Sequence, residues 1–163
     1  MSPHALLIGD VIGSRGVADR PALHSHLTAV LAEVNEHLDP VQGLEVTVGD
    51  EYQGVFATVG AAVAATLVVR LRMLPDHDVR HGVGWGERTV LDDRGVQDGP
   101  GWWAARAAID EVRRAETTAT LRNLRTSYRL ADDTPGADEA SINAALVLRD
   151  EQVTAMSTRS LSV

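Results

Sequence analysis

Cysteine is absent from this chain of 163 residues, which excludes disulfide bonds and metal sites built on thiolates. Also missing is an apolar run of about 18 residues, the length that a bilayer-spanning helix requires. No basic residues precede the short apolar segment at 5–8, and Asp10 follows it, a pattern unlike that of a secretory signal peptide. These absences favour a cytoplasmic protein without a membrane anchor.

Positive charge is scarce as well. The chain has 15 Lys and Arg residues against 23 Asp and Glu residues, which gives a net charge of −8 and a pI near 5.1. A domain that binds duplex DNA usually carries a basic face, because counterion release from the phosphates drives much of the affinity. We therefore do not expect this segment to bind nucleic acid. A small phosphate ligand is compatible with the charge, because a divalent cation can neutralise carboxylates.

Hydrophobic periodicity predicts an α+β fold. Some segments show apolar residues at helical spacing, and others alternate or cluster as strands do. Helices are expected over 20–38, 61–73, 102–115 and 140–156, and strands over 5–8, 44–48, 52–57, 79–85, 88–91 and 126–130. This order is typical of a ferredoxin-like sandwich, with one mixed, mostly antiparallel sheet and helices on one face. The strand over 88–91 is expected to pair with the strand over 79–85.

The chain is expected to divide after residue 131. Residues 1–131 would form the α+β domain, and the sequence Asp-Asp-Thr-Pro-Gly over 132–136 is typical of a linker. The rest of 132–163 would then be one helix and a frayed tail over 157–163.

Two Gly-Asp pairs, Gly9-Asp10 and Gly49-Asp50, give the strongest indication of chemistry. Asp10 ends the first strand and Asp50 lies at the tip of the following hairpin, so neighbouring strands would bring their carboxylates together. Such a pair needs a cation or a shared proton, and Mg²⁺ typically binds one or two carboxylates together with substrate phosphates. A glycine before each aspartate lets a ligand approach the backbone. Because Gly-Asp is also common in turns, the spacing alone leaves a purely structural role open.

A short loop, Gly-Ser-Arg-Gly over 13–16, follows Asp10. Successive backbone N–H groups in such a loop can form a nest that binds an anion, and Arg15 can bind phosphate through two parallel hydrogen bonds. Ser14 and Arg15 are therefore candidate ligand-binding residues. The alternative is a flexible loop with a solvated arginine.

Two adjacent tryptophans begin the predicted helix over 102–115. Trp102 and Trp103 would point about 100° apart, so one is expected in the core and the other could stack on a purine or pack against a second subunit. Arg106 lies one turn beyond Trp102 on the same side of the helix. It is a further candidate for binding phosphate.

Four other polar residues lie near these motifs. His77 and His81 flank a turn and a strand and are expected at the surface. Glu51 and Glu87 follow the hairpin and a strand end, where either could join the site, but they too are expected to be exposed.

Taken in order along the chain, these motifs resemble those of the SatD family of small bacterial proteins. The resemblance is carried by the segments over 8–15, 48–54 and 98–106, and it extends over most of residues 5–130.

SatD-like sequences are in turn similar to class III nucleotide cyclase domains. This similarity implies metal-binding roles for Asp10 and Asp50. It also implies that Arg106, at the end of an Ala-Ala-Arg sequence, stabilises a triphosphate across a dimer interface. The pair Gly49-Asp50 with the residues after it is similar to the signature of diguanylate cyclases, which have a related fold.

Two positions depart from the cyclase pattern. Trp102 stands where cyclases have an asparagine that orients the ribose, and Val46 stands where they have a lysine that selects the purine. Loss of both groups, with both carboxylates kept, predicts nucleotide binding without efficient cyclisation.

The leading hypothesis is a homodimeric regulatory domain that binds a nucleotide or another phosphate ligand through Mg²⁺ or Mn²⁺. Asp10 and Asp50 would hold the metal, and the ligand would contact Gly9, Ser14, Arg15, Gly49, Trp102 and Arg106. If the protein is an enzyme, we expect phosphoryl chemistry of the nucleotidyl cyclase type. Two alternatives stay open. One is a transcriptional regulator, since residues 142–160 resemble the approach to a helix-turn-helix; the other is a degenerate dimerisation scaffold.

Overall fold

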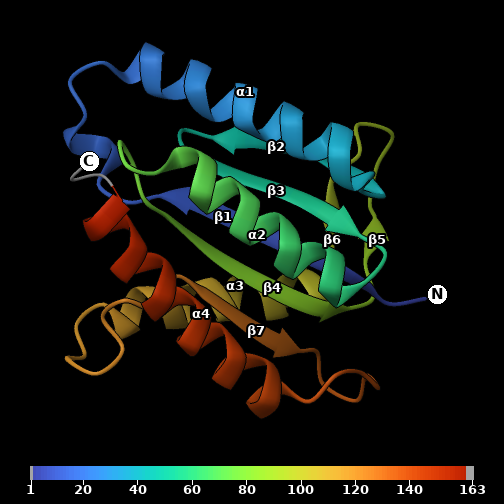
Figure 1. Cartoon of the computed structure of the whole chain (residues 1–163). Coiled ribbons are helices and arrows are strands. Elements are labelled where there is room, and N and C mark those ends of the chain that lie inside the picture. The colour runs from blue at the N-terminus through green and yellow to red at the C-terminus, as the bar shows by residue number, and fades with distance from the viewer. Residues whose placement is uncertain (1, 161–163) are drawn as a thin grey trace.

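One mixed sheet forms the centre of the molecule. The computed structural model describes residues 2–160, with side chains described through residue 156. The sheet contains β1 (His4–Val11), β2 (Gln42–Val48), β3 (Glu51–Phe56), β4 (Val79–Gly86) and β7 (Thr126–Leu130). Their order is β2-β3-β1-β4-β7, and every neighbouring pair is antiparallel except β4 and β7 (Figure 1). The predicted mixed, mostly antiparallel sheet is confirmed.

Helices cover both faces of this sheet (Figure 1). Within the described residues they are α1 (Arg20–Leu38), α2 (Val59–Met73), α3 (Pro100–Ala115) and α4 (Glu139–Ser160). The first, second and fourth lie on one face and α3 lies on the other, so the prediction of helices on a single face is wrong. The reason is visible in β1, where Leu7 belongs to the core under α1 and α2, while Leu6 and Ile8 belong to the core under α3. A continuous apolar strand is typical of a sheet that is buried on both faces.

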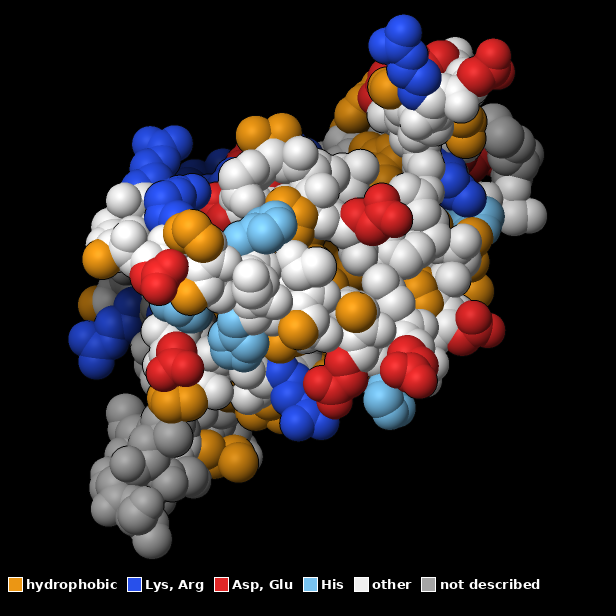
Figure 2. All heavy atoms as spheres, turned by 90° about the horizontal axis from the view of Figure 1, so that it is seen from above, with side chains coloured by type: hydrophobic (Ala, Val, Ile, Leu, Met, Phe, Trp, Pro, Cys, Tyr) orange, Lys and Arg blue, Asp and Glu red, His pale blue; other side chains and the backbone are white. Residues whose placement is uncertain are grey.

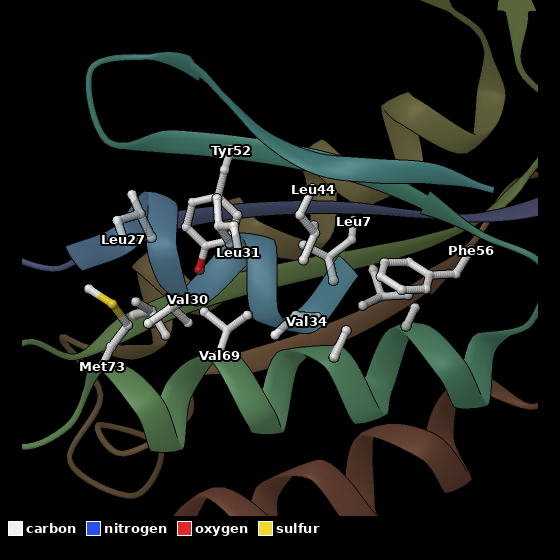
Figure 3. Packing of buried hydrophobic residues seen from close by; sticks show 14 of the residues in the cluster. Leu7, Leu27, Val30, Leu31, Val34, Leu44, Tyr52, Phe56, Val69 and Met73 are labelled. Atoms are coloured by element: carbon white, nitrogen blue, oxygen red, sulfur yellow. The ribbon is translucent and has the colours of Figure 1, made fainter. Parts of the chain in front are cut away.

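The larger core lies between the sheet and the first two helices (Figure 3). Leu27 and Leu31 of α1 and Val69 of α2 meet Leu7 and Tyr52 of the sheet there. Both helices begin at side chains that cap them, since Asp19 accepts a hydrogen bond from Ala22 N and Thr58 accepts one from Ala61 N.

Glycines bring α3 close to β4. A Cβ atom added at Gly84 would lie 2.3 Å from both Ala105 N and Gly101 O, and one added at Gly82 would lie 2.3 Å from Ala105 O. The alternating glycines of β4 therefore leave room for the backbone of the helix. This close approach fixes the position of α3 relative to the end of β1.

The last helix packs on the sheet through a buried charge. Asp150 of α4 is fully buried, and its Oδ2 accepts hydrogen bonds from Arg125 N at 2.7 Å and Thr126 N at 2.8 Å at the start of β7. Its Oδ1 lies 3.1 Å from Arg149 and 3.5 Å from Arg70, which is 1% exposed. The helix extends past the predicted end at residue 156, and 161–163 of the predicted tail lie outside the described residues. A domain boundary after residue 131, and a helix-turn-helix beginning in 132–163, stay predictions.

A two-stranded arm stands apart from the main sheet. It consists of β5 (Thr89–Val90) paired antiparallel with β6 (Gln97–Asp98). The prediction that 88–91 pairs with 79–85 is therefore wrong. Both edges of β4 are already occupied, one by β1 and the other by β7, so no position is left for a third neighbour.

His81, predicted at the surface, is completely buried in β4. Its Nε2 shares a hydrogen bond of 2.8 Å with the hydroxyl of Tyr52, and its Nδ1 has no partner among the described residues. Burial lowers the pKa of His81 to about 3, and the positive charges of Arg149 and Arg70 act in the same direction, against Asp78.

This depressed pKa predicts a loss of stability in acid. The unfolded chain takes up a proton below about pH 6.5, while folded His81 stays neutral down to about pH 3. Its contribution to the free energy of unfolding is complete above pH 6.5 and falls by up to about 1.4 kcal/mol per pH unit below it. Urea unfolding of wild type, His81→Gln and the exposed control His24→Gln between pH 7.5 and 4.5 measures this slope. His81→Gln should lose it and His24→Gln should keep it; parallel curves for all three proteins would refute the assignment.

The surface over α1 carries mixed charge. Viewed from above, acidic, basic and histidine side chains are scattered over this face without a continuous basic patch (Figure 2). Among residues 2–160, no helix combines the length and apolar character needed to cross a bilayer.

Candidate functional site

A cavity of about 670 Å³ opens where β1 ends, beside the turn between β2 and β3. Its charged lining consists of three carboxylates and four arginines: Asp10, Asp50, Glu51, Arg15, Arg20, Arg80 and Arg113. Gly49 and Ser14 also line it. The structure thus brings together the two predicted metal ligands and three of the predicted ligand-binding residues. It adds Arg20, Arg80 and Arg113, which the sequence did not indicate.

Asp10 is held by two of these arginines. Its side chain is 9% exposed, and Arg80 Nε donates to Oδ1 at 2.8 Å while an Nη atom of Arg113 donates to Oδ2 at 2.5 Å. Arg80 lies directly opposite Asp10 in the register of β1 and β4. Arg113 reaches the same carboxylate from α3. A buried carboxylate needs such compensation, because loss of its hydration costs several kcal/mol.

Each of these arginines has a second acidic partner. Arg80 also binds Glu116 at 3.1 and 3.2 Å, and Arg113 also binds Asp110 of α3 at 2.8 Å. Burial disfavours the charged form of Arg113, but its hydrogen bonds to Asp10 and Asp110 outweigh this effect and raise its pKa. These arginines and carboxylates therefore form a connected network of ion pairs at the site.

Asp50 lies at the tip of the turn between β2 and β3. Gly49 has a φ of +64°, a left-handed conformation that glycine adopts without strain and that the turn requires. The turn directs Asp50 toward β1, where its Oδ2 accepts a hydrogen bond from Val11 N at 3.1 Å. Because Val11 follows Asp10, the Asp50 carboxylate is bonded to the backbone next to Asp10, and both aspartates line the cavity.

The loop after β1 contains the short helical turn η1 (Ser14–Gly16). Gly16 N and Val17 N donate to Gly13 O and Ser14 O, so these two N–H groups bond within the loop and do not point to a ligand. Ser14 is buried, its carbonyl accepts a hydrogen bond from Arg20 at 3.0 Å, and Arg15 stands exposed at the cavity wall. The loop and the start of α1 thus present the side chains of Arg15 and Arg20 to the cavity.

The other predicted ligand-binding residues lie elsewhere. Gly9 faces the ring of Tyr52, which a Cβ atom would approach to 2.3 Å. Trp102 is 7% exposed, and its Nε1 donates to Gln97 at 3.2 Å. Arg106 forms two hydrogen bonds to Glu51, at 2.7 and 2.9 Å, which raise its pKa. None of the three residues lines the cavity, although Arg106 touches its wall through Glu51.

The side chains at the cavity can supply only part of the coordination shell of a divalent cation. Among the described residues, no group of three or more His, Cys, Asp or Glu side chains could hold a metal ion by itself. Two carboxylates are nevertheless enough for Mg²⁺, which keeps several waters and takes further oxygens from phosphate. Asp10 and Asp50 line the same cavity and can supply them, in competition with the arginines bound to Asp10.

Comparison with known protein families identifies the chain. The model of the SatD family matches residues 4–147. The chain belongs to the SatD family. None of the curated protein sequences compared with this SatD-family chain matches it.

Solved structures share its fold. A bacterial light-regulated adenylyl cyclase superposes with a TM-score of 0.60 and 10% identity over 78% of this chain and 43% of that one. The chain thus spans less than half the length of that cyclase. The active GGEEF domain of a diguanylate cyclase from Vibrio cholerae has a TM-score of 0.53 and 12% identity, covering 82% and 85% of the two chains. An adenylate/guanylate cyclase/hydrolase from Silicibacter pomeroyi has a TM-score of 0.50 and 20% identity, covering 64% and 67%. The predicted cyclase-like α+β fold is confirmed.

Proposed function

We propose that this SatD-family domain binds a nucleotide or another phosphate ligand together with Mg²⁺ or Mn²⁺ in the cavity beside Asp10 and Asp50. One observation carries the proposal: both carboxylates line one cavity, and its lining also contains four arginines. The likeness to cyclase and diguanylate cyclase domains supports a site of this kind but is a likeness of fold.

The charge of the cavity favours a phosphate ligand that arrives with a metal ion. Four arginines against three carboxylates leave a surplus of one positive charge in the lining. A bound divalent cation would raise this surplus to three, which suits an anion with several negative charges such as a diphosphate or triphosphate. Asp10 and Asp50 would hold the cation, and Arg15 and Arg20 would contact phosphate. When bound, the cation would neutralise charge on the phosphate oxygens.

Ligand binding in a regulatory role fits the site better than cyclase turnover. Trp102 occupies the position of the ribose-orienting asparagine, and here it is buried and bonded to Gln97. Val46, at the purine-selecting position, offers no hydrogen bond from its side chain. Arg106 is bound to Glu51 of its own chain. A homodimer, in which Arg106 would act across the interface, is part of this proposal.

A degenerate scaffold is the second candidate function. The observation in its favour is that both oxygens of Asp10 are already bonded, one to Arg80 and one to Arg113. In a protein that binds no metal, this ion-pair cluster would be a purely structural contact between β1, β4 and α3.

Calorimetric titration of ATP and GTP in the presence of Mn²⁺ tests the proposal. Asp50→Asn removes one charged metal ligand but can keep the hydrogen bond from Val11 N, so we expect at least a roughly tenfold weaker affinity, about 1.4 kcal/mol. Asp93→Asn, which changes an exposed aspartate outside the cavity, serves as the matched control and should bind as wild type does. Equal affinity in all three proteins would reject the metal site. Absence of any binding would favour the scaffold.

A further inference from the structure

We propose that Arg113 is a phosphate-binding residue that Asp10 holds in the metal-free protein and releases when a divalent cation takes its place. The inference rests on the proposed function and deepens it, because it makes metal and phosphate binding cooperative.

Competition for the same oxygens is the first step. Arg80 and Arg113 each occupy one carboxylate oxygen of Asp10, at 2.8 and 2.5 Å. A cation that binds Asp10 needs at least one of these oxygens, and its positive charge repels the guanidinium already there. Each oxygen keeps a further lone pair for the cation, but this repulsion favours the release of one arginine when Asp10 binds a metal.

Of the two arginines, Arg113 is the one free to leave. Its side chain is 35% exposed, whereas that of Arg80 is 17% exposed and starts directly opposite Asp10 on the neighbouring strand. Arg113 also keeps a partner after release, since Asp110 binds its other Nη atom at 2.8 Å. Its departure from Asp10 thus leaves no unpaired charge, while Arg80 stays between Asp10 and Glu116.

The released guanidinium stays at the site. Arg113 lines the cavity together with Arg15 and Arg20. The Nη atom that binds Asp10 can donate instead to a phosphate oxygen, while Asp110 keeps the other Nη atom. Exchange of Asp10 for phosphate therefore preserves the bonding of Arg113 and couples the two ligands: the metal raises the affinity for phosphate, and phosphate raises the affinity for the metal by the same factor.

Two binding measurements on the intact chain test this coupling. The first is Mn²⁺ binding alone, followed by the electron paramagnetic resonance of free Mn²⁺. The second is binding of inorganic pyrophosphate with and without Mg²⁺, followed by calorimetry. The proteins are wild type, Arg113→Gln, Arg113→Lys and the control Arg114→Gln, which removes the same charge from the exposed neighbouring position of α3.

Removal of the competitor should strengthen the metal site and weaken the phosphate site. We expect Arg113→Gln to bind Mn²⁺ alone about fivefold or more tightly than wild type and to lose most of the gain in pyrophosphate affinity that Mg²⁺ gives to wild type. In both measurements, Arg113→Lys should give affinities between those of wild type and Arg113→Gln. Arg114→Gln should behave as wild type does. If wild type and Arg113→Gln bind Mn²⁺ equally, this inference is overturned and the proposed function stands. If none of the four proteins binds Mn²⁺ alone or pyrophosphate together with Mg²⁺, the proposed function falls as well.

Discussion

Replacing Asp150 by alanine is expected to lower the free energy of unfolding by about 3–5 kcal/mol, the range found when one partner of a buried ion pair is removed. Asp150 is fully buried and its Oδ2 accepts the N–H groups of Arg125 and Thr126 at the start of β7. Alanine would leave both N–H groups without this acceptor and would remove the carboxylate that faces Arg70 and Arg149. Because these contacts join α4 to the sheet and to α2, the helix should detach first.

Chemical unfolding monitored by circular dichroism measures the loss. Glu151→Ala is the matched control, since Glu151 is the exposed neighbour on α4 and its hydrogen bond to Asn123 lies at the surface. Its effect should stay within about 0.5 kcal/mol. Asp150→Asn keeps one acceptor oxygen, so its loss of stability should lie between those of Glu151→Ala and Asp150→Ala. A loss below about 1 kcal/mol in Asp150→Ala would show that α4 is held by its apolar contacts alone.

Gly84→Ala is expected to cost about 3 kcal/mol or more, because it pushes α3 off the sheet. The added Cβ would lie 2.3 Å from Ala105 N and from Gly101 O, and backbone atoms of a packed helix cannot turn aside as a side chain can. The displacement would also move Arg113 and Arg106, which α3 carries toward Asp10 and Glu51.

A second glycine gives the control for this substitution. A Cβ at Gly60, in the first turn of α2, would meet nothing within 4 Å. Gly60→Ala should leave stability unchanged or raise it by up to about 1 kcal/mol, because alanine favours a helix. In thermal and urea unfolding, Gly84→Ala should therefore be less stable than wild type. Gly60→Ala should be as stable as wild type or more stable. Similar losses in the two variants would contradict the close packing of α3 on β4.

Local sequence patterns were sufficient to place the two aspartates. The alternation in β2 and β3 and the short turn between them predict a hairpin, and the apolar run before Asp10 predicts a buried strand. Pairing of β1 with β3 then brings Asp10 and Asp50 to the lining of one cavity. The family motifs depend on the same short segments, which is why family and fold could both be recognised.

Contacts between distant segments could not be predicted in this way. Arg113 lies 103 residues after Asp10, and nothing in its local sequence distinguishes it from the exposed Arg114 beside it. Arg80 could have been found only from the register of β1 and β4, where it faces Asp10. The environments of His81 and Gly9 depend likewise on Tyr52, which reaches both residues from β3. Such side-chain partners depend on the folded arrangement of strands and helices.

The central claim is that Asp10 and Asp50 jointly hold a divalent cation that accompanies a phosphate ligand. Its most direct test is anomalous diffraction from crystals soaked with Mn²⁺ and ATP. We predict an anomalous peak between the two carboxylates, with nucleotide phosphate on the same ion and Arg113 turned from Asp10 to the phosphate. A cavity without such a peak, in which Arg80 and Arg113 both remain bonded to Asp10 at high Mn²⁺ and ATP concentrations, would contradict the claim.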